Sequence, residues 1–221
     1  MTSGPRWTRD QSEFDRAIGF VDATFAFALT LLATTLDIGD MRRVWDSTQA
    51  LGAEINPQLI AFVISFAVIS SYWLAHHRMI ASFTAIDTPV IVANLALIAT
   101  IVVLQFATEA VGSPNIDDLP LPTAVLAVNV AAASGVNTLV YVLGAKRGLI
   151  DPEPSRTAFT ADVVRGLLPA AVFLASIPIA YATTPATAHL FWIAYPLIAW
   201  LIRRWGVPRP AASDDSARRT R

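Results

Sequence analysis

The sequence predicts an all-α integral membrane protein whose subunit crosses the bilayer six times. Of its 221 residues, 54% are hydrophobic and only 15% are charged, whereas soluble domains carry about 25% charged residues. Apolar stretches long enough to span a hydrocarbon core recur along the chain, and the basic residues fall in alternate connections between them. A soluble helical bundle is the main alternative. The absence of a polar face along whole stretches argues against it.

Six apolar stretches have the composition of membrane spans, and they cover residues 17–36, 58–78, 90–111, 123–144, 167–182 and 189–202. Asn56 and Pro57 suit the N-cap and the first position of the second helix, Pro89 opens the third, and the turn signal at 119–122 precedes the fourth. We predict one six-helix transmembrane domain over residues 1–205. Residues 206–221 are polar and are expected to form a disordered cytoplasmic tail.

The basic residues test the number of spans independently. With six spans, all but two of the 16 Lys and Arg residues lie on one side of the membrane, the exceptions being Arg42 and Arg43. The connection after the third span is instead acidic, with Asp117 and Asp118. Because cytoplasmic loops carry the excess of Lys and Arg, both termini are predicted to be cytoplasmic. The N-terminus lacks the pattern of a cleaved signal peptide.

Several classes of function are disfavoured by composition and by missing motifs. The net charge of -1 gives no argument for nucleic-acid binding, and without cysteine there are no disulfides or thiolate metal sites. The chain contains no phosphate-binding loop, no G-x-S-x-G and no H-E-x-x-H motif. We therefore expect no enzymatic activity, no cofactor and no permanently bound metal.

The first span, RAIGFVDATFAFALTLLATTLDI from Arg16 to Ile38, carries polar groups on two neighbouring stripes. At 100° per residue, Asp22 shares one stripe with Ala26, Leu29 and Ala33, and the second stripe consists of Ala23, Phe27, Thr30 and Thr34. A carboxylate near the centre of a span costs about 3 kcal/mol. Asp22 is therefore either part of an ion or proton pathway or a packing anchor. If the second stripe lines a pore, Asp22 points sideways into the protein, which favours the anchor.

The second span ends in SYWLAHHRMI, which predicts a membrane interface. Tyr72 and Trp73 suit the headgroup region, and Arg78 suits its cytoplasmic edge. Because His76 and His77 point about 100° apart, we expect one to face headgroups and the other to pack inside. Polar residues in later spans are expected to form interhelical hydrogen bonds; they are Asn94, Gln105, Asn129 and Asn137.

Two motifs carry a resemblance to a known family. Arg16-x-x-x-Phe20-Val21-Asp22 resembles the R-x-x-x-F-S-D signature of the transmembrane protein 175 family, which comprises prokaryotic relatives of lysosomal and endosomal potassium channels. The stretch YWLAHHR, residues 72–78, is similar to the end of that family's second helix, and an asparagine early in the third helix also fits. The likeness covers roughly residues 13–110.

The resemblance implies a homotetramer in a prokaryotic plasma membrane, with the first helices lining a central potassium pathway. Phe27 then stands at the narrowest apolar ring, Thr30 lies one turn beyond it where potassium binds transiently, and Ala23 and Thr34 continue the pore wall. A packing network that holds the pore helix is implied for Arg16, Phe20, Asp22, Trp73, His77 and Asn94. Two residues depart from the family: Val21 replaces a serine, and Phe27 replaces an isoleucine or leucine.

These observations predict a potassium-permeable cation channel that gates by dewetting at Phe27. The carbonyl filter sequence TVGYG is absent, and Glu109, Asp117 and Asp118 would concentrate cations at the outer mouth. Two alternatives stay open from the residues. One is a proton-coupled transporter that uses Asp22 and His77, and the other is a membrane scaffold that conducts nothing.

Overall fold

A computed structural model describes residues 5–36, 42, 45–113 and 115–192. Long helices dominate it: α1 (Ser12–Leu31), α3 (Thr48–Ile80), α4 (Thr88–Gly112), α5 (Pro120–Lys146) and α6 (Arg156–Ala182). A 3-10 turn, η1 (Leu32–Thr35), extends α1, and two short strands, β1 (Arg6–Thr8) and β2 (Ala85–Asp87), lie at one end. Residues 185–192 are again helical.

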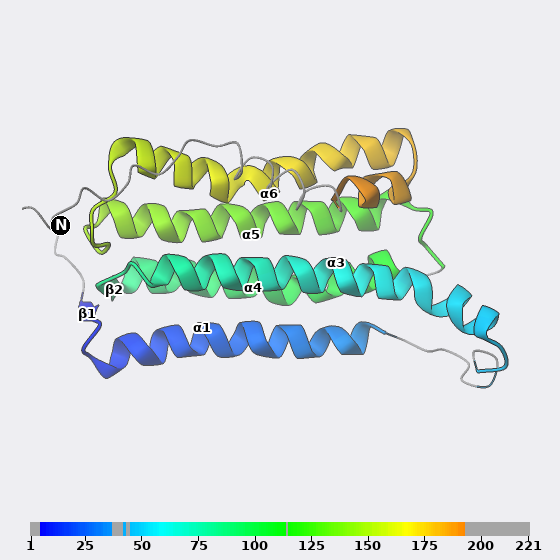
Figure 1. Ribbon diagram of the computed structural model, residues 1–221, viewed down its shortest axis with the longest axis horizontal. Coiled ribbons are helices and arrows are strands. Elements are labelled where there is room, and N and C mark those ends of the chain that lie inside the picture. Colours follow the sequence, from blue (N-terminus) through cyan, green and yellow to red (C-terminus); the bar gives the residue numbers. More distant parts are fainter. Residues whose placement is uncertain (1–4, 37–41, 43–44, 114, 193–221) are drawn as a thin grey trace, which may run out of the picture.

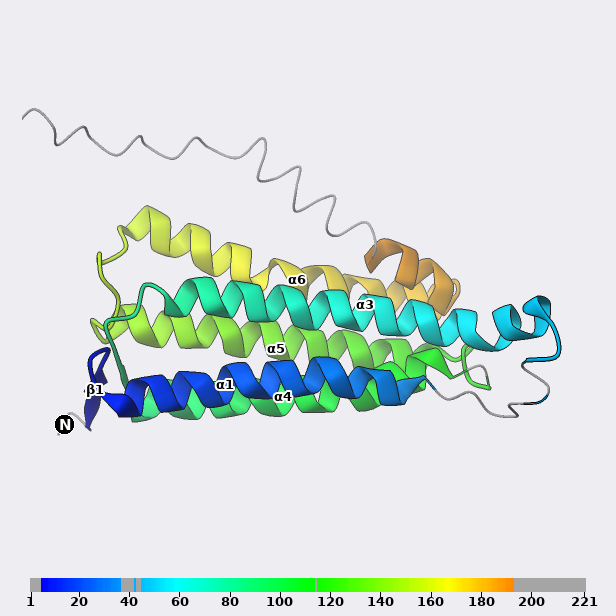
Figure 2. The same ribbon diagram turned by 60° about the horizontal axis from the view of Figure 1, so that its bottom comes forward.

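The long helices lie side by side as an elongated bundle (Figure 1). Helix α5 packs between α4 and α6, and α1 packs against both α3 and α4. Rotated by 60°, the bundle shows α1 and α6 on opposite sides of it (Figure 2). Helix α1 is therefore a peripheral helix of the protomer, with one side left uncovered.

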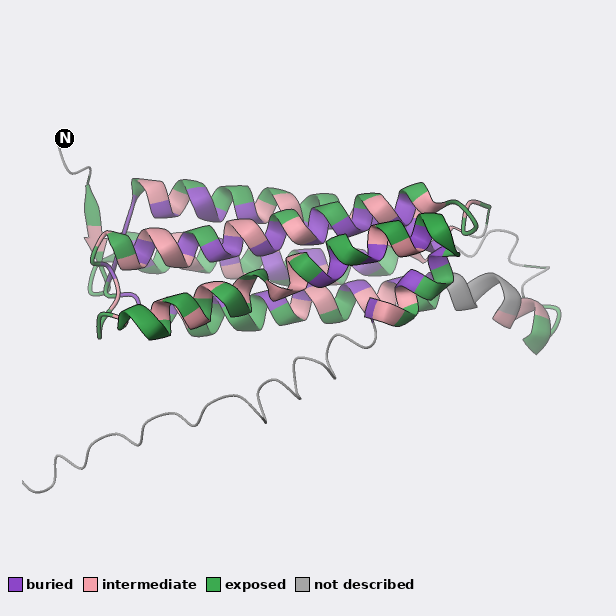
Figure 3. Ribbon diagram, turned by 90° about the horizontal axis from the view of Figure 1, so that it is seen from above, coloured by how far each residue is buried: buried purple, intermediate pink, exposed green. Residues whose placement is uncertain are grey.

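Five of the described helices are long and apolar enough to cross a membrane. Their spans are Ser12–Thr35, Gln58–Ile80, Thr88–Gly112, Pro120–Lys146 and Arg156–Ala182. Exposed and buried residues alternate around each helix (Figure 3), and the exposed ones include many large apolar side chains, such as Val102, Phe106 and Leu190. An apolar exterior of this kind suits a lipid solvent. The predicted sixth span, 189–202, is helical at 189–192, and its remainder, with the predicted tail at 206–221, lies outside the described residues.

All five long helices begin earlier than the sequence predicts, and the reasons are visible for three of them. Helix α3 starts at Thr48, because the Ser47 hydroxyl accepts a 3.1 Å hydrogen bond from the Ala50 amide and acts as the cap predicted for Asn56. Helix α5 starts at Pro120, inside the stretch predicted to be a turn, where proline suits the first turn of a helix. Helix α6 starts at Arg156, capped by Ser155, so its polar first turns extend the apolar span predicted at 167–182.

A short antiparallel pair of strands, β1 and β2, and an isolated bridge between Phe83 and Ile150 accompany the helices. Trp7 pairs with Ile86 at the centre of the strand pair, and the strands join the N-terminal segment to the connection before α4. Three-residue strands leave no periodic pattern in a sequence. The predicted all-helical class is confirmed for the spans, and the strand pair lies outside them.

Candidate functional site

Helix α1 has a buried face and an exposed face. Phe14, Val21, Phe25 and Ala28 are buried against the rest of the bundle. Phe27 is 63% exposed, and Ala23, Thr30 and Thr34 are exposed beside it. The stripe predicted from helical periodicity therefore lies on the side of α1 that the protomer leaves uncovered. We call Ala23, Phe27, Thr30 and Thr34 the α1 stripe.

The threonine hydroxyls of the α1 stripe donate their protons to their own helix. Thr30 Oγ1 donates to the Phe27 carbonyl at 2.8 Å, and Thr34 Oγ1 donates to the Leu31 carbonyl at 2.6 Å. A hydroxyl has one proton and two lone pairs. Because the proton is used within the helix, the lone pairs of each exposed oxygen are left to accept.

Asp22 lies at the side of this stripe and contacts α3. The Trp73 indole Nε1 donates a 3.0 Å hydrogen bond to Asp22 Oδ1. The same indole stacks on the His77 imidazole, with ring centroids 5.4 Å apart. A carboxylate on α1 is thus joined to an aromatic pair on α3, so the contact fixes the rotation of α1 about its axis.

Arg16 and Phe20 do not join this contact within the protomer. Phe20 is 57% exposed and lines a hollow of about 60 Å³ against α4, together with Asn94. The reason is geometric: positions 20 and 22 lie about 200° apart on a helix. Arg16 is exposed and has no hydrogen bond or ion pair with the described part of the chain. Of the residues that the resemblance joins in one network, Phe20 thus lies beside α4 in the protomer, away from Asp22 and Trp73.

Asn94 is buried but does not bridge helices. It is 3% exposed, and its Nδ2 donates to the Val90 carbonyl of its own helix at 3.0 Å. Its Oδ1 has no hydrogen-bond partner among the described residues. The prediction of an interhelical bond therefore fails for Asn94.

The other predicted interhelical bonds are present and brace the buried side of the site. Gln105 donates to the Ala28 carbonyl at 2.8 Å, and Asn129 donates to the Thr100 carbonyl at 3.1 Å. His76, only 1% exposed, bonds Asn137 Oδ1 at 3.2 Å, whereas His77 is exposed. The prediction that the two histidines differ in burial is confirmed.

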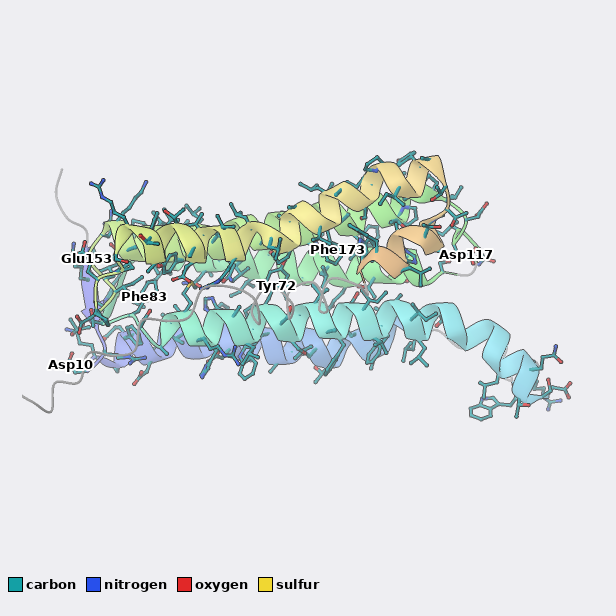
Figure 4. All side chains as sticks on the ribbon, turned by 45° about the horizontal axis from the view of Figure 1, so that its top comes forward. Asp10, Tyr72, Phe83, Asp117, Glu153 and Phe173 are labelled. Atoms are coloured by element: carbon teal, nitrogen blue, oxygen red, sulfur yellow. The ribbon has the colours of Figure 1, made fainter. Side chains whose placement is uncertain are left out.

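Tyr72 is a core residue and not the interfacial residue that its neighbour Trp73 suggested. Its side chain is buried, and its hydroxyl donates to the Val130 carbonyl at 2.8 Å and lies 2.5 Å from Ser134 Oγ. The phenol therefore links α3 to the small-residue part of α5 in the middle of the bundle (Figure 4). Small residues there let the helices approach closely.

Asp87 forms a buried polar site that the sequence did not predict. Asp87 is fully buried, caps α4 by accepting from the Val90 amide at 3.2 Å, and pairs with Arg147 at the end of α5. Arg147 in turn offers its carbonyl to Arg6 at 3.3 Å. The available signal was an aspartate directly before Thr88-Pro89, which is a good N-cap position.

Comparison with known proteins connects the chain to a family of potassium channels. The model of the family described as endosomal/lysosomal potassium channel TMEM175 matches residues 16–105, which include α1 from Arg16 onward, α3 and most of α4. The resemblance to the TMEM175 family is confirmed. A curated potassium channel of Streptomyces collinus is 26% identical over 179 residues, 80% of this chain and 86% of the relative. One of Chamaesiphon minutus is 28% identical over 101 residues, 45% of this chain and 49% of that relative.

Solved TMEM175 structures show the same fold. The crystal structure of a homologue of the lysosomal potassium-selective channel TMEM175, from Chamaesiphon minutus, aligns with a TM-score of 0.71 at 21% identity, covering 86% of this chain and 99% of that one. A variant of the potassium channel MtTMEM175, in complex with a nanobody fusion protein, aligns with a TM-score of 0.60 at 19% identity, covering 89% and 94%. The chain is thus an integral membrane protein with a TMEM175-like fold.

Proposed function

We propose that the chain is the subunit of a potassium-permeable cation channel in a prokaryotic plasma membrane. Four copies would assemble with their α1 stripes around a shared axis. The observation that carries the proposal is the exposed α1 stripe, because a wall of small, hydroxyl-bearing and aromatic side chains on an uncovered helix face needs a partner other than its own bundle. The relatives named as potassium channels supply the ion.

In this assembly Phe27 forms the constriction. Four aromatic side chains at one level exclude water from a narrow apolar ring, and such a ring gates by dewetting. For the channel to open, the four Phe27 side chains must then move apart or rotate. The hydrogen bond between Asp22 and Trp73 supports this role. It restrains the rotation of α1 about its own axis at a position just before Phe27.

Thr30 and Thr34 would receive the partly dehydrated ion beyond the ring. The lone pairs of their exposed oxygens are left to accept, and oxygen donors are the ligands that alkali cations accept in channels. A ring of hydroxyls is a sparser cage than stacked carbonyls. We therefore expect a moderate preference for potassium over sodium.

The experiment is a bilayer recording of the purified protein under a potassium/sodium gradient. We expect a cation current whose reversal potential is shifted from 0 mV toward the potassium equilibrium potential. Cross-linking in the same vesicles shows whether the protein is inserted and oligomeric. If it is, and no current flows, the protein is a scaffold and not a channel. A reversal potential set by chloride would also contradict the proposal.

The proton-coupled alternative is separated from the channel by Asp22→Asn. Asparagine keeps an oxygen for the Trp73 indole but removes the titrating carboxylate. If Asp22 is an anchor, potassium current persists in the variant while Asp22→Ala impairs it. If Asp22 relays protons, both substitutions abolish transport, and flux in the native protein saturates and follows the pH gradient.

A further inference from the structure

A hollow of about 360 Å³ lies where α5 ends and α6 begins, away from the α1 stripe. Its polar lining comes from Lys146, Glu153, Arg156 and Thr160, and Phe159 forms part of its wall. Figure 4 places Glu153 in the α5–α6 connection, at the same end of the bundle as Phe83 and opposite Asp117. The proposed channel leaves this hollow without a role.

Two cations in the lining are free to bind an anion. Neighbouring arginines are occupied, since Arg147 pairs with Asp87 and Arg165 with Asp162. Within the described ranges, Lys146 and Arg156 form no ion pair. Together with the single carboxylate of Glu153, they leave the lining with a net positive charge, which the positive end of the α6 dipole increases.

The hydroxyl of Thr160 adds no donor, because it already donates to the Arg156 carbonyl at 2.9 Å. The ligand must therefore satisfy an ammonium and a guanidinium that line one hollow from two helix ends. Arginine and lysine bind phosphate oxygens through charge-assisted hydrogen bonds. A phosphate group is the chemical class that matches this pair.

The position of the hollow indicates where that phosphate comes from. Lys146 is the last residue of one candidate membrane span and Arg156 the first of the next, so the hollow lies at the end of both helices, where a lipid headgroup can reach it. Phe159 stacks on Tyr141, with centroids 5.7 Å apart. Below it, Val164 and Leu167 expose apolar side chains along α6, which can accompany an acyl chain.

We propose that this hollow binds the phosphate of an anionic phospholipid headgroup, held by Lys146 and Arg156. Basic pockets between transmembrane helices bind such headgroups, and each Lys or Arg near an anionic surface contributes appreciable affinity. The Glu153 carboxylate repels the phosphate, and the attraction of the two cations has to exceed that repulsion for the lipid to bind. A soluble phosphate is the other source of the same chemistry.

Native mass spectrometry of the detergent-purified protein tests this by titration with phosphatidylglycerol and, separately, with phosphatidylcholine. We expect phosphatidylglycerol to bind more tightly. The Lys146→Gln/Arg156→Gln double variant should weaken its binding about tenfold or more, and Glu153→Gln should strengthen it. The matched control is Arg165→Gln, which removes the same charge from α6 outside the hollow and should leave binding within about twofold of the native value. Single Arg156→Gln, expected to show part of the loss, serves if the double variant fails to fold.

The proposal is overturned if the double variant binds phosphatidylglycerol like the native protein, or if Arg165→Gln loses as much affinity. Equal binding of phosphatidylcholine would remove the headgroup preference. Displacement of the lipid by an equal concentration of inorganic phosphate would assign the hollow to a soluble anion. None of these outcomes depends on whether the protein conducts ions.

Discussion

Phe27 is the residue on which the proposed gate rests. A phenyl ring that is 63% exposed in the protomer makes few contacts within its own bundle. Phe27→Ala should therefore leave the protomer folded while it widens the apolar ring, and single-channel conductance should rise several-fold. Phe27→Leu, which restores the family's residue type, should give an intermediate value. Unchanged conductance in Phe27→Ala would place the constriction elsewhere.

Thr30 tests the contribution of a hydroxyl at the next turn. Thr30→Val keeps the shape of the side chain but removes the oxygen, so the ion loses one ligand per subunit. We expect the preference for potassium over sodium to fall, as measured by the shift of the reversal potential. Thr30→Ser keeps the hydroxyl and is the control. If Val and Ser variants select alike, Thr30 does not contact the ion.

At the residue scale, periodicity predicted the exposed stripe because a helix repeats every 3.6 residues whatever its surroundings. It placed Ala23, Phe27 and Thr30 on one face, and the structure exposes that face. It could not say what Asp22 contacts, since the Trp73 indole comes from a distant part of the chain. The resemblance groups Phe20 with Asp22 in one network. The two positions lie about 200° apart on a helix, so they cannot share one face.

At the element scale, α5 is held against the end of the bundle by Gly144. A Cβ at this position would overlap the ring of Phe83, which is fully buried and cannot move aside. Gly144→Ala should lower the melting temperature in detergent. Gly135→Ala on the same helix has no atom within 4 Å of the added carbon and should be neutral or slightly stabilising, as expected for Ala in a helix. Equal effects of the two substitutions would contradict this packing.

The pair of Asp87 and Arg147 joins the start of α4 to the end of α5. Asp87 is fully buried, so Arg147→Ala leaves a carboxylate without its counter-charge, and breaking such a pair costs about 3 kcal/mol. The exposed pair of Arg165 and Asp162 is the matched control, worth at most about 1 kcal/mol. Thermal unfolding of both variants should separate them clearly. An Arg147→Ala protein as stable as Arg165→Ala would show that solvent reaches Asp87.

Elements were predictable where lipid imposes their length. The third span, predicted at 90–111, is Thr88–Gly112 in the structure, because an apolar run bounded by Pro89 and a polar loop leaves little freedom. Ends in water were less predictable: α3 and α6 continue as polar turns beyond the predicted spans. Capping by Ser47 and Ser155 decides those ends, and serine is common in loops as well as at caps.

At the scale of the whole molecule, basic residues gather at one end of the bundle. Lys146 ends α5 and Arg156 begins α6, and the connection between them, marked by Glu153, lies at the opposite end of the bundle from Asp117 (Figure 4). Helices that cross a membrane one after another place successive connections at opposite ends of the bundle, which gives this distribution. The basic end is the one we assign to the cytoplasm, following the positive-inside rule.

The assembly around α1 is the central claim, and the absence of cysteine from the chain allows a direct test of it. Single cysteines placed along α1 can be probed with a membrane-impermeant thiol reagent while potassium current is recorded. We expect the reagent to block current in Ala23→Cys, Thr30→Cys and Thr34→Cys and to leave current in Val21→Cys and Ala28→Cys unchanged. Block at Val102→Cys on the outside of α4, with none along the α1 stripe, would contradict a pore lined by α1.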